Sequence, residues 1–551
     1  MEQENVSASS SSNSGQKPGL LRVLGLWDIV SIVIGGVIGS GIFLVPMAMA
    51  GHVQSPLLML AVWAVGGLLS FFGALSFAEL GAAFPEAGGI YVYLREAYGH
   101  LVSFLFGWTL FLVIDAGAVA TLAVAFSKEY LPRLIPNMSG LTIQLVAAGM
   151  IVFLMAANYF GARWGANLQN LLTVIKFGAL IIICGVIFIF AKGSMANFVS
   201  PKASKIFNLA EFKFYATGIV FVVLSLTGLY MLLRKAHRLV LRIIGGGAFF
   251  VFAILAYIRF SNIPAANTLL AGRTNFIAAF GAALVASLWA YKGWEAATYS
   301  GAETKRPERN LPLGLLIGTA VCVIIYVIAN LAYLYVMPVG EIAKTPYVAS
   351  VAIGKVIGSL GAALTAVVIL FSILGAANQN LLCSPRVYYS MARDGLFFKS
   401  LAGIHPKFHT PHLAIIAMGA WSIVLSLWGS FEKLFTYVIL GEWVFFGMTA
   451  AAVIVLRKKR PDLHRPYKTF GYPVTPIIFI LGSLFILGLG IKDMAKDIPG
   501  YGQAISSGGS AGQIIKSILT NPVTALFIIV LGIPAYAYWQ RRNRKKASKP
   551  S

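Results

Sequence analysis

Charged residues are scarce in this chain. Aspartate, glutamate, lysine and arginine together make up 11% of its 551 residues, whereas hydrophobic residues make up 58% and the mean hydropathy is +0.80. Soluble domains carry about 25% charged residues. The composition therefore excludes a soluble globular protein and indicates a polytopic membrane protein.

Cysteine is also rare, with only Cys184, Cys322 and Cys383. Each lies in or at the end of an apolar run, and the sequence has no C-x-x-C pair or Cys/His cluster. These spacings predict neither a disulfide framework nor a metal site. Because the sequence also has no nucleophile and base arrangement and no phosphate-binding loop, we expect neither an enzyme nor a cofactor.

Acidic residues are fewer than basic ones, 19 against 43, which gives a formal net charge of +24. A nucleic-acid-binding protein would gather such a charge on one face. Here the basic residues lie in short segments between apolar runs and in the tail Arg541–Lys546. The charge is therefore interpreted as membrane topology, and no nucleic-acid partner is expected.

Fourteen apolar runs are long enough to cross the hydrocarbon core, which takes about 20 residues of helix. An even number places both termini on one side, and the positive-inside rule selects the cytoplasm. Two of the runs, 214–233 and 239–258, could instead form a re-entrant or peripheral hairpin, because lysines in the connection before them would otherwise lie outside. The runs are 24–50, 55–82, 101–127, 141–160, 168–191, 214–233, 239–258, 274–298, 312–336, 359–383, 412–430, 434–456, 471–491 and 521–540.

Glycines interrupt the first apolar run at Ile34–Phe43, which reads IGGVIGSGIF. Unpaired backbone at membrane depth is costly and is tolerated where it lines a cavity or binds a ligand. A second interruption, ASLWAYKGW at 286–294, lies inside another apolar run. Paired breaks indicate a transporter site, although glycines also let membrane helices pack closely.

The segment Ile38–Phe43 resembles the G-S-G break in the first helix of the amino acid/polyamine/organocation (APC) superfamily. The run Ala78–Gly99 is similar to the second helix of that superfamily and the loop that follows it. A third match runs from Trp289–Glu295 on to Glu303–Pro312. Within that superfamily, these motifs most resemble those of the L-type amino acid transporters and their bacterial relatives.

This resemblance implies an all-α, polytopic membrane protein with a five-plus-five inverted-repeat core, broken first and sixth helices, and about 12 helices plus an inserted pair. It would hold its substrate between the first helices of the two repeats. The implied organisation is a disordered cytoplasmic tail at 1–22, a first repeat at 23–194, an insertion with two extra helices at 195–262, a second repeat at 263–456, two C-terminal helices at 457–540 and a basic cytoplasmic tail at 541–551.

A restarted helix presents unpaired N–H groups that suit a carboxylate, and a halted one presents carbonyls that suit an ammonium group. We therefore expect Ser40 and Gly41 to bind the carboxylate of an amino acid, and the carbonyls of Val37, Trp289 and Lys292 to bind its amino group. The resemblance also implies that Trp289 is an aromatic gate over the substrate, whereas an interfacial tryptophan is the alternative. The complete predicted binding set is Val37, Ile38, Gly39, Ser40, Gly41, Trp289, Ala290, Lys292 and Gly293.

Lys176 lies inside an apolar run, where a charge costs about 2.5–3.5 kcal/mol and usually has a function. Snorkelling to the inner interface is the alternative. In sodium-independent relatives a lysine at this place resembles a built-in substitute for sodium, with its ammonium on the carbonyls of the first helix. A lysine that releases and rebinds a proton would instead support proton symport, so exchange and symport both stay open.

Lys292 departs from the family pattern, in which a small or acidic residue stands before the glycine. A cation facing the cavity would favour acidic substrates, whereas a pair with Glu295, three residues on, would neutralise it. The other acids inside apolar runs are Asp115, Glu79 and Glu442, and among them Asp115 is the candidate for a proton-linked group.

The sequence thus predicts a sodium-independent secondary active transporter, either an exchanger or a proton symporter, that moves amino acids across the plasma membrane. The alternative is a transport-inactive, transporter-like sensor or accessory subunit. The loop that contains Asn137 has no cysteine, so a disulfide-linked heavy subunit is not expected.

Overall fold

The computed structural model describes residues 19–198, 266–428, 431–506 and 523–547. Within these ranges the backbone is helical and no strand forms, since the only β contacts there are two isolated bridges, Leu24 with Thr304 and Ala87 with Ser300. The described part is therefore all-α, as predicted. The predicted runs 214–233 and 239–258 lie outside the described residues.

Six helical stretches of the described chain are long and apolar enough to cross a membrane. Each coincides with one of the predicted apolar runs. They are Pro56–Ala83 (α3), His100–Arg133 (which contains α5, His100–Thr109, and α6, Asp115–Val124), Gly140–Tyr159 (α7), Ala162–Phe190 (α8), Pro307–Val336 (α13) and Val348–Arg393 (α15, Val348–Cys383, with α16, Pro385–Arg393). Shorter apolar helices are Ala278–Ala290, His412–Leu427 and Val474–Gly490.

The first apolar run forms two helices, α1 (Leu26–Val37) and α2 (Gly41–Val53), which together are long enough to span and meet at a 41° bend. Ile38 ends α1 because its ψ of 82° is not helical. Gly41 then begins α2 after a gap of three residues. The glycine-rich sequence at 34–43 therefore produces a break in the backbone.

The helix in the predicted run 274–298 is also interrupted. The helix α12 (Ala266–Ala290) ends at Ala290, and a turn leads into a short 3-10 helix, η5 (Glu295–Tyr299). Gly293 permits this turn because its φ of +117° is unfavourable for residues with a side chain. The turn lies within the interruption predicted at 286–294, and the run ends at 298 in a 3-10 helix.

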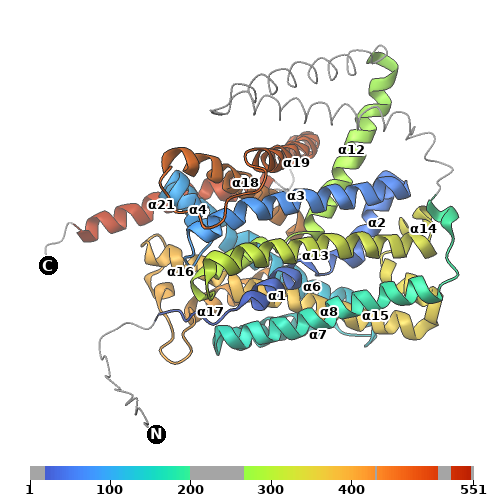
Figure 1. Ribbon diagram of the computed structural model, residues 1–551, viewed down its shortest axis with the longest axis horizontal. Coiled ribbons are helices and arrows are strands. Elements are labelled where there is room, and N and C mark those ends of the chain that lie inside the picture. The colour runs from blue at the N-terminus through green and yellow to red at the C-terminus, as the bar shows by residue number, and fades with distance from the viewer. Residues whose placement is uncertain (1–18, 199–265, 429–430, 507–522, 548–551) are drawn as a thin grey trace, which may run out of the picture.

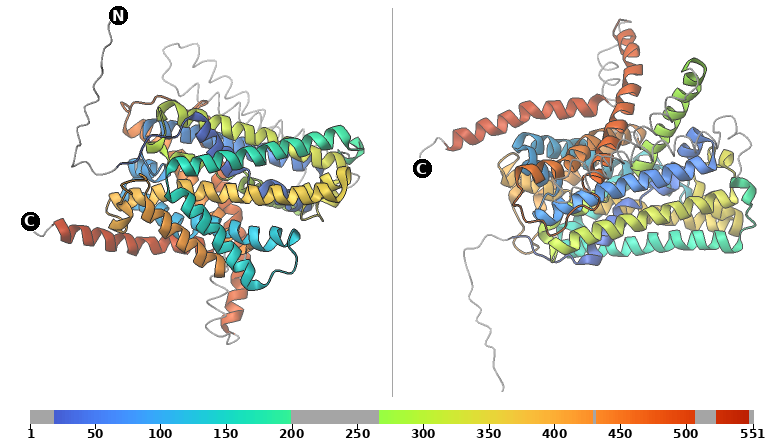
Figure 2. Two further views of the ribbon diagram at one scale, coloured as in Figure 1. Left: turned by 90° about the horizontal axis from the view of Figure 1, so that it is seen from below. Right: turned by 45° about the horizontal axis from the view of Figure 1, so that its top comes forward.

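The broken helix α1 packs at the centre of the bundle, against α13, α8 and α15. Figure 1 shows α3, α13 and α8 running side by side, with α1 between them, and α12 meets α2 and α3. The last helices are α17 (His412–Trp428), α18 (Phe431–Lys459), α19 (Val474–Ser506) and α21 (Val523–Ala547). In Figure 2, α21 extends away from the packed bundle in both views, and part of α12 does so in the right view.

Ion pairs concentrate at one end of the bundle, where several helices begin or end. They join the start of α1 to α8, the end of α3 to α18, and the segment before α13 to α16. The pairs are Arg163 with Asp28 at 2.8 Å, Arg457 with Glu79 at 2.6 Å, and Arg386 with Glu303 at 2.7 Å. Glu79 is thereby used in a structural pair, away from the two chain breaks.

Candidate functional site

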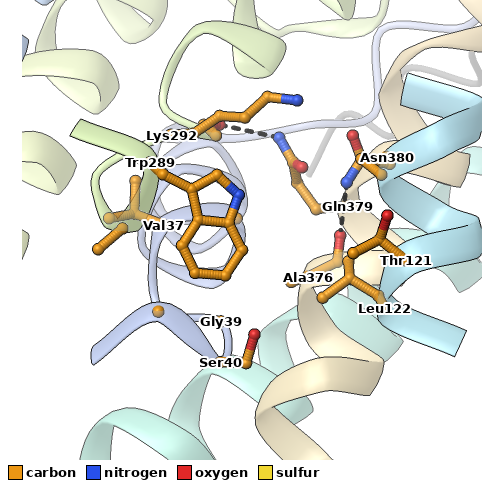
Figure 3. A pocket seen from close by; sticks show the side chains of 15 residues that line it. Val37, Gly39, Ser40, Thr121, Leu122, Trp289, Lys292, Ala376, Gln379 and Asn380 are labelled. Atoms are coloured by element: carbon orange, nitrogen blue, oxygen red, sulfur yellow. Dashed lines mark hydrogen bonds between the residues drawn. The ribbon is translucent and has the colours of Figure 1, made fainter. Parts of the chain in front are cut away.

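A pocket lies between the two chain breaks (Figure 3). One wall is the break between α1 and α2, and the facing wall is the end of α12 with the turn after it. The helices α6 and α15 close the remaining sides. The lining residues are Gly36, Val37, Gly39, Ser40, Gly41, Ala118, Thr121, Leu122, Trp289, Ala290, Lys292, Gly293, Ala376, Gln379 and Asn380.

Glycines let the two breaks touch. A Cβ added at Gly293 would lie 2.7 Å from the carbonyl carbon of Gly36, and one added at Gly36 would lie 2.9 Å from the carbonyl oxygen of Gly293. At Gly41 an added Cβ would lie 2.8 Å from the Cα of Ala290. Backbone atoms leave no room for a side chain at these positions, so the glycines set the spacing of the two walls.

The start of α2 offers donors to the pocket. The hydroxyl of Ser40 is buried and has no hydrogen-bond partner in the described structure. Gly41 opens the first turn of α2, where backbone N–H groups have no acceptor within the helix. A buried hydroxyl next to a helix N-terminus is suited to an anionic group.

The carbonyl groups at the breaks are held in place by side chains of neighbouring helices. The phenol of Tyr326 in α13 donates to the carbonyl oxygen of Val37 at 2.7 Å and lies within hydrogen-bond distance, 3.1 Å, of the carbonyl oxygen of Ala290 on the opposite break. Ser372 of α15 lies within hydrogen-bond distance of the carbonyl oxygens of Ile38 and Gly39, at 2.9 and 3.0 Å. The carbonyl oxygen of Val37 also accepts from the backbone N–H of Gly39 at 2.8 Å, so both of its lone pairs are engaged in this structure.

Lys176 of α8 is completely buried and donates to the carbonyl oxygen of Gly35 in α1, with the carbonyl oxygen of Ser372 3.5 Å away. The snorkelling alternative is therefore wrong for this structure. The ammonium satisfies the carbonyl group of Gly35, just before the first break. Its role as a substitute for sodium stays a prediction.

Gln379 and Asn380 of α15 line the pocket but were not among the predicted site residues. The side-chain amide of Gln379 donates to the carbonyl oxygen of Gly293 at 2.9 Å, which ties the second break to α15. The sequence did contain a signal, because Asn378, Gln379 and Asn380 form a polar triplet inside an apolar run. Thr121 and Leu122 of α6, which carry no such signal, form the wall beside them.

Lys292 lies beside two buried acids of other helices. Its ammonium is 3.3 Å from Oε1 of Glu442 in α18 and 3.6 Å from Oδ1 of Asp115 in α6. The hypothesis of a pair with Glu295 is corrected, since a carboxylate oxygen of Glu295 accepts instead from the backbone N–H of Gly293 at 3.0 Å. Spacing by three residues brings side chains together only on a regular helix, and the chain turns here. Figure 3 shows the amine of Lys292 pointing away from Ser40.

Trp289 lines the pocket, and its ring lies between Lys292 and Ser40 in Figure 3. It is therefore not a lipid-facing residue, although its role as a gate stays a prediction. Tyr291 and Trp294 do not line the pocket and are buried, as expected for packing residues. The ring of Tyr291 meets the ring of Trp63 edge to face, 5.7 Å apart.

The chain is similar to known amino acid transporters over most of its length. The chain is 29% identical to the b(0,+)-type amino acid transporter 1 of Mus musculus over 85% of this chain and 82% of the mouse protein. It is 30% identical to the serine/threonine exchanger SteT of Bacillus subtilis (strain 168), over 85% of this chain and 91% of that protein. It is 27% identical to the cystine/glutamate transporter of Homo sapiens, over 96% of this chain and 88% of the human protein. The family model for amino acid permeases matches residues 24–233 and 240–508, so the chain belongs to the amino acid permease family of multi-pass membrane proteins.

Proposed function

We propose that this protein is a sodium-independent secondary active transporter that carries amino acids across the plasma membrane by alternating access. The observation that carries the proposal is the pair of chain breaks, whose backbone groups face one pocket from opposite sides. The transporters and exchangers of amino acids among its relatives support the same function.

Within the pocket, the N–H groups at the start of α2 and the Ser40 hydroxyl would bind the substrate carboxylate. The carbonyl groups of Val37 and Trp289 would bind the amino group, which at Val37 would have to replace one of the two hydrogen bonds present in this structure. The side chain of the substrate then points to the third wall, formed by Thr121, Leu122 and Asn380. Backbone groups accordingly recognise any α-amino acid, and this third wall selects among them.

Sodium independence follows from the position of Lys176. A cation that satisfies the carbonyl of Gly35 supports the first break from behind, at the end of α1. A bound sodium ion would otherwise have to supply this positive charge. Because the lysine is covalently part of the chain, transport should need no sodium gradient.

The proposed architecture has two five-helix repeats, 23–194 and 263–456, followed by two helices at 457–540. The arginines that pair at one end of the bundle support a cytoplasmic location for that end, by the positive-inside rule. Both termini would then be cytoplasmic. No disulfide-linked partner is proposed, because the three cysteines are buried and the loop Leu134–Ser139 has none.

Counterflow in proteoliposomes tests the function. Vesicles are preloaded with unlabelled serine, leucine, cystine, arginine or glutamate, and uptake of the same labelled amino acid is followed with potassium salts on both sides. A transporter gives saturable, transient accumulation for at least one of them. A transport-inactive sensor would bind the amino acid without accumulating it, and that result would overturn the proposal.

A further inference from the structure

One end of the pocket is continuous with a cluster of buried ionisable groups, here named the 292 cluster: Asp115, Lys292, Glu295 and Glu442. The members come from four different segments, α6, the turn after α12, η5 and α18. The three acids are each at most 2% exposed. The cluster therefore places one ammonium group and three carboxyl groups in the interior of a membrane protein.

The charges in this cluster do not balance. Lys292 lies 3.3 Å from Glu442 and 3.6 Å from Asp115, and one ammonium can neutralise only one carboxylate. A buried charge without a partner is strongly unfavourable in a protein interior and more so inside a bilayer. With all members ionised the cluster would have three negative charges against one positive charge, and a bound cation would reduce this excess.

The three acids differ in the hydrogen bonds that they accept. Asp115 accepts from the hydroxyl of Ser384 at 2.5 Å, and Glu295 accepts from the backbone N–H of Gly293 at 3.0 Å. Glu442 differs, because its Oε1 is buried and has no hydrogen-bond partner among the described residues. This oxygen lies within ion-pair distance of the ammonium of Lys292, but the two groups do not have the geometry of a hydrogen bond. Among the three acids, Glu442 is thus the one with a carboxylate oxygen that is buried without a hydrogen bond in the described structure.

We infer that Glu442 is a proton-binding site of this transporter, held next to Lys292 and coupled through it to the substrate pocket. A proton binds to a carboxylate oxygen of Glu442 and later dissociates from it. The O–H bond is the only bond that forms and breaks. A metal ion is not the cation we propose, because no three His, Cys, Asp or Glu side chains in the described ranges are grouped to hold one. The inference rests on the proposed transport function and adds its coupling ion.

The route from this proton to the substrate is short. Lys292 belongs both to the cluster and to the pocket lining, and Ala118 and Leu122, one and two turns after Asp115 on α6, also line the pocket. Glu295 holds the N–H of Gly293, whose φ of +117° shapes the turn next to Trp289. A change of charge at Glu442 therefore acts on the segment that carries the proposed gate.

Other titratable groups surround the cluster, and none supplies a second cation. Facing it are the phenols of Tyr299 and Tyr388, the thiol of Cys383, and the pair Arg386 with Glu303, whose charges cancel. The other ion pair of α18, Arg457 with Glu79, lies 15 residues along the helix, or about 22 Å away. Lys292 is the only ammonium group that contacts Glu442 in the described structure.

The test uses the full-length protein in proteoliposomes with the membrane potential held at zero by valinomycin and equal potassium. Labelled serine and leucine are used as probes, because both are zwitterions with neutral side chains. A pH one unit lower outside should drive accumulation of about tenfold at one proton per substrate. A trapped pH-sensitive dye should report acidification of the lumen only when the amino acid is added.

Glu442→Gln should keep counterflow at equal pH, because glutamine has the same size and leaves Lys292 with Asp115. It should lose both the tenfold accumulation and the dye response. Glu341→Gln is the matched control, since Glu341 is partly exposed and pairs with Lys355 at 2.7 Å on the surface. This control should behave as the wild type does.

Three results would overturn the inference. Wild-type counterflow without any effect of the pH gradient would exclude proton coupling and leave the transport function intact. A Glu442→Gln protein that still accumulates substrate tenfold would place the proton elsewhere. Absence of wild-type counterflow with every amino acid would remove the transport function, and the inference with it.

Discussion

The phenol of Tyr326 donates a hydrogen bond of 2.7 Å to the carbonyl oxygen of Val37, the last residue of α1. The same phenol lies 3.1 Å from the carbonyl oxygen of Ala290, the last residue of α12. A single side chain of α13 thus connects the ends of two helices that belong to different halves of the sequence. The spacing of the pocket walls depends on this bridge as well as on the glycines.

We predict that Tyr326→Phe weakens transport because the phenol that joins the carbonyl groups of Val37 and Ala290 is lost, while Val37 keeps only the N–H of Gly39 as a donor. An unsatisfied buried group costs about 1–3 kcal/mol, so counterflow should fall by roughly tenfold and the melting temperature in detergent should drop. Tyr333→Phe is the matched control, since the hydroxyl of Tyr333 on the same helix is buried without a hydrogen-bond partner. Equal loss of counterflow in the two variants would show that the bridge has no role.

Gly41→Val is expected to abolish binding of every amino acid alike. The new Cβ would lie 2.8 Å from the Cα of Ala290, so α2 and α12 would have to separate. Binding of labelled serine, leucine and glutamate to the purified protein measures the effect. Gly178→Val is the control, because a Cβ on Gly178 in α8 has no atom within 4 Å. Unchanged affinity of Gly41→Val for any of the three would place the carboxylate site elsewhere.

Much of this arrangement could be predicted from the sequence. The glycines at 34–43 and the segment 286–294 predicted both chain breaks, because glycine weakens a helix and tolerates backbone angles that other residues avoid. The cost of a charge in an apolar helix singled out Lys176, whereas its contact with the carbonyls of the first helix was implied by the family resemblance. These signals are local, and each depends on residues within one turn of the feature that they predict.

Contacts between distant segments were harder to predict. Lys292 was expected to pair with Glu295 or to face the cavity, but its partners lie 177 positions before it and 150 after it in the chain. The bridge of Tyr326 and the amide of Gln379 were missed for the same reason. The polar triplet at 378–380 marks this part of α15 in the sequence, but it does not show which of the three side chains turns toward the break.

Transport should not depend on sodium, and Lys176→Met should abolish it. The variant removes the donor to the carbonyl of Gly35, at the centre of the bundle, while keeping the apolar volume. Uptake by the wild type should be equal in sodium and in choline buffers. Lys344→Met serves as the control, because Lys344 is exposed. Wild-type uptake that occurs only with sodium would refute this prediction.

The final prediction concerns the charge of Lys292. Lys292→Met leaves Asp115 and Glu442 buried without their cation, and breaking a buried pair typically costs about 3–5 kcal/mol. The melting temperature of the purified variant should fall clearly below that of the wild type. The double variant Lys292→Met with Glu442→Gln should recover much of the loss, because it removes one of the two stranded carboxylates.

The same variants decide how Lys292 affects selectivity. Because its charge is already engaged by two acids, wild-type uptake of leucine should be inhibited by glutamate no more strongly than by serine. Glu442→Gln frees part of that charge next to the pocket, so inhibition by glutamate should increase while inhibition by arginine decreases. Competition curves for glutamate and arginine, measured on both proteins, test this. If the curve for glutamate and the curve for arginine are each the same in the wild type and in Glu442→Gln, the charge of Lys292 does not affect substrate selectivity.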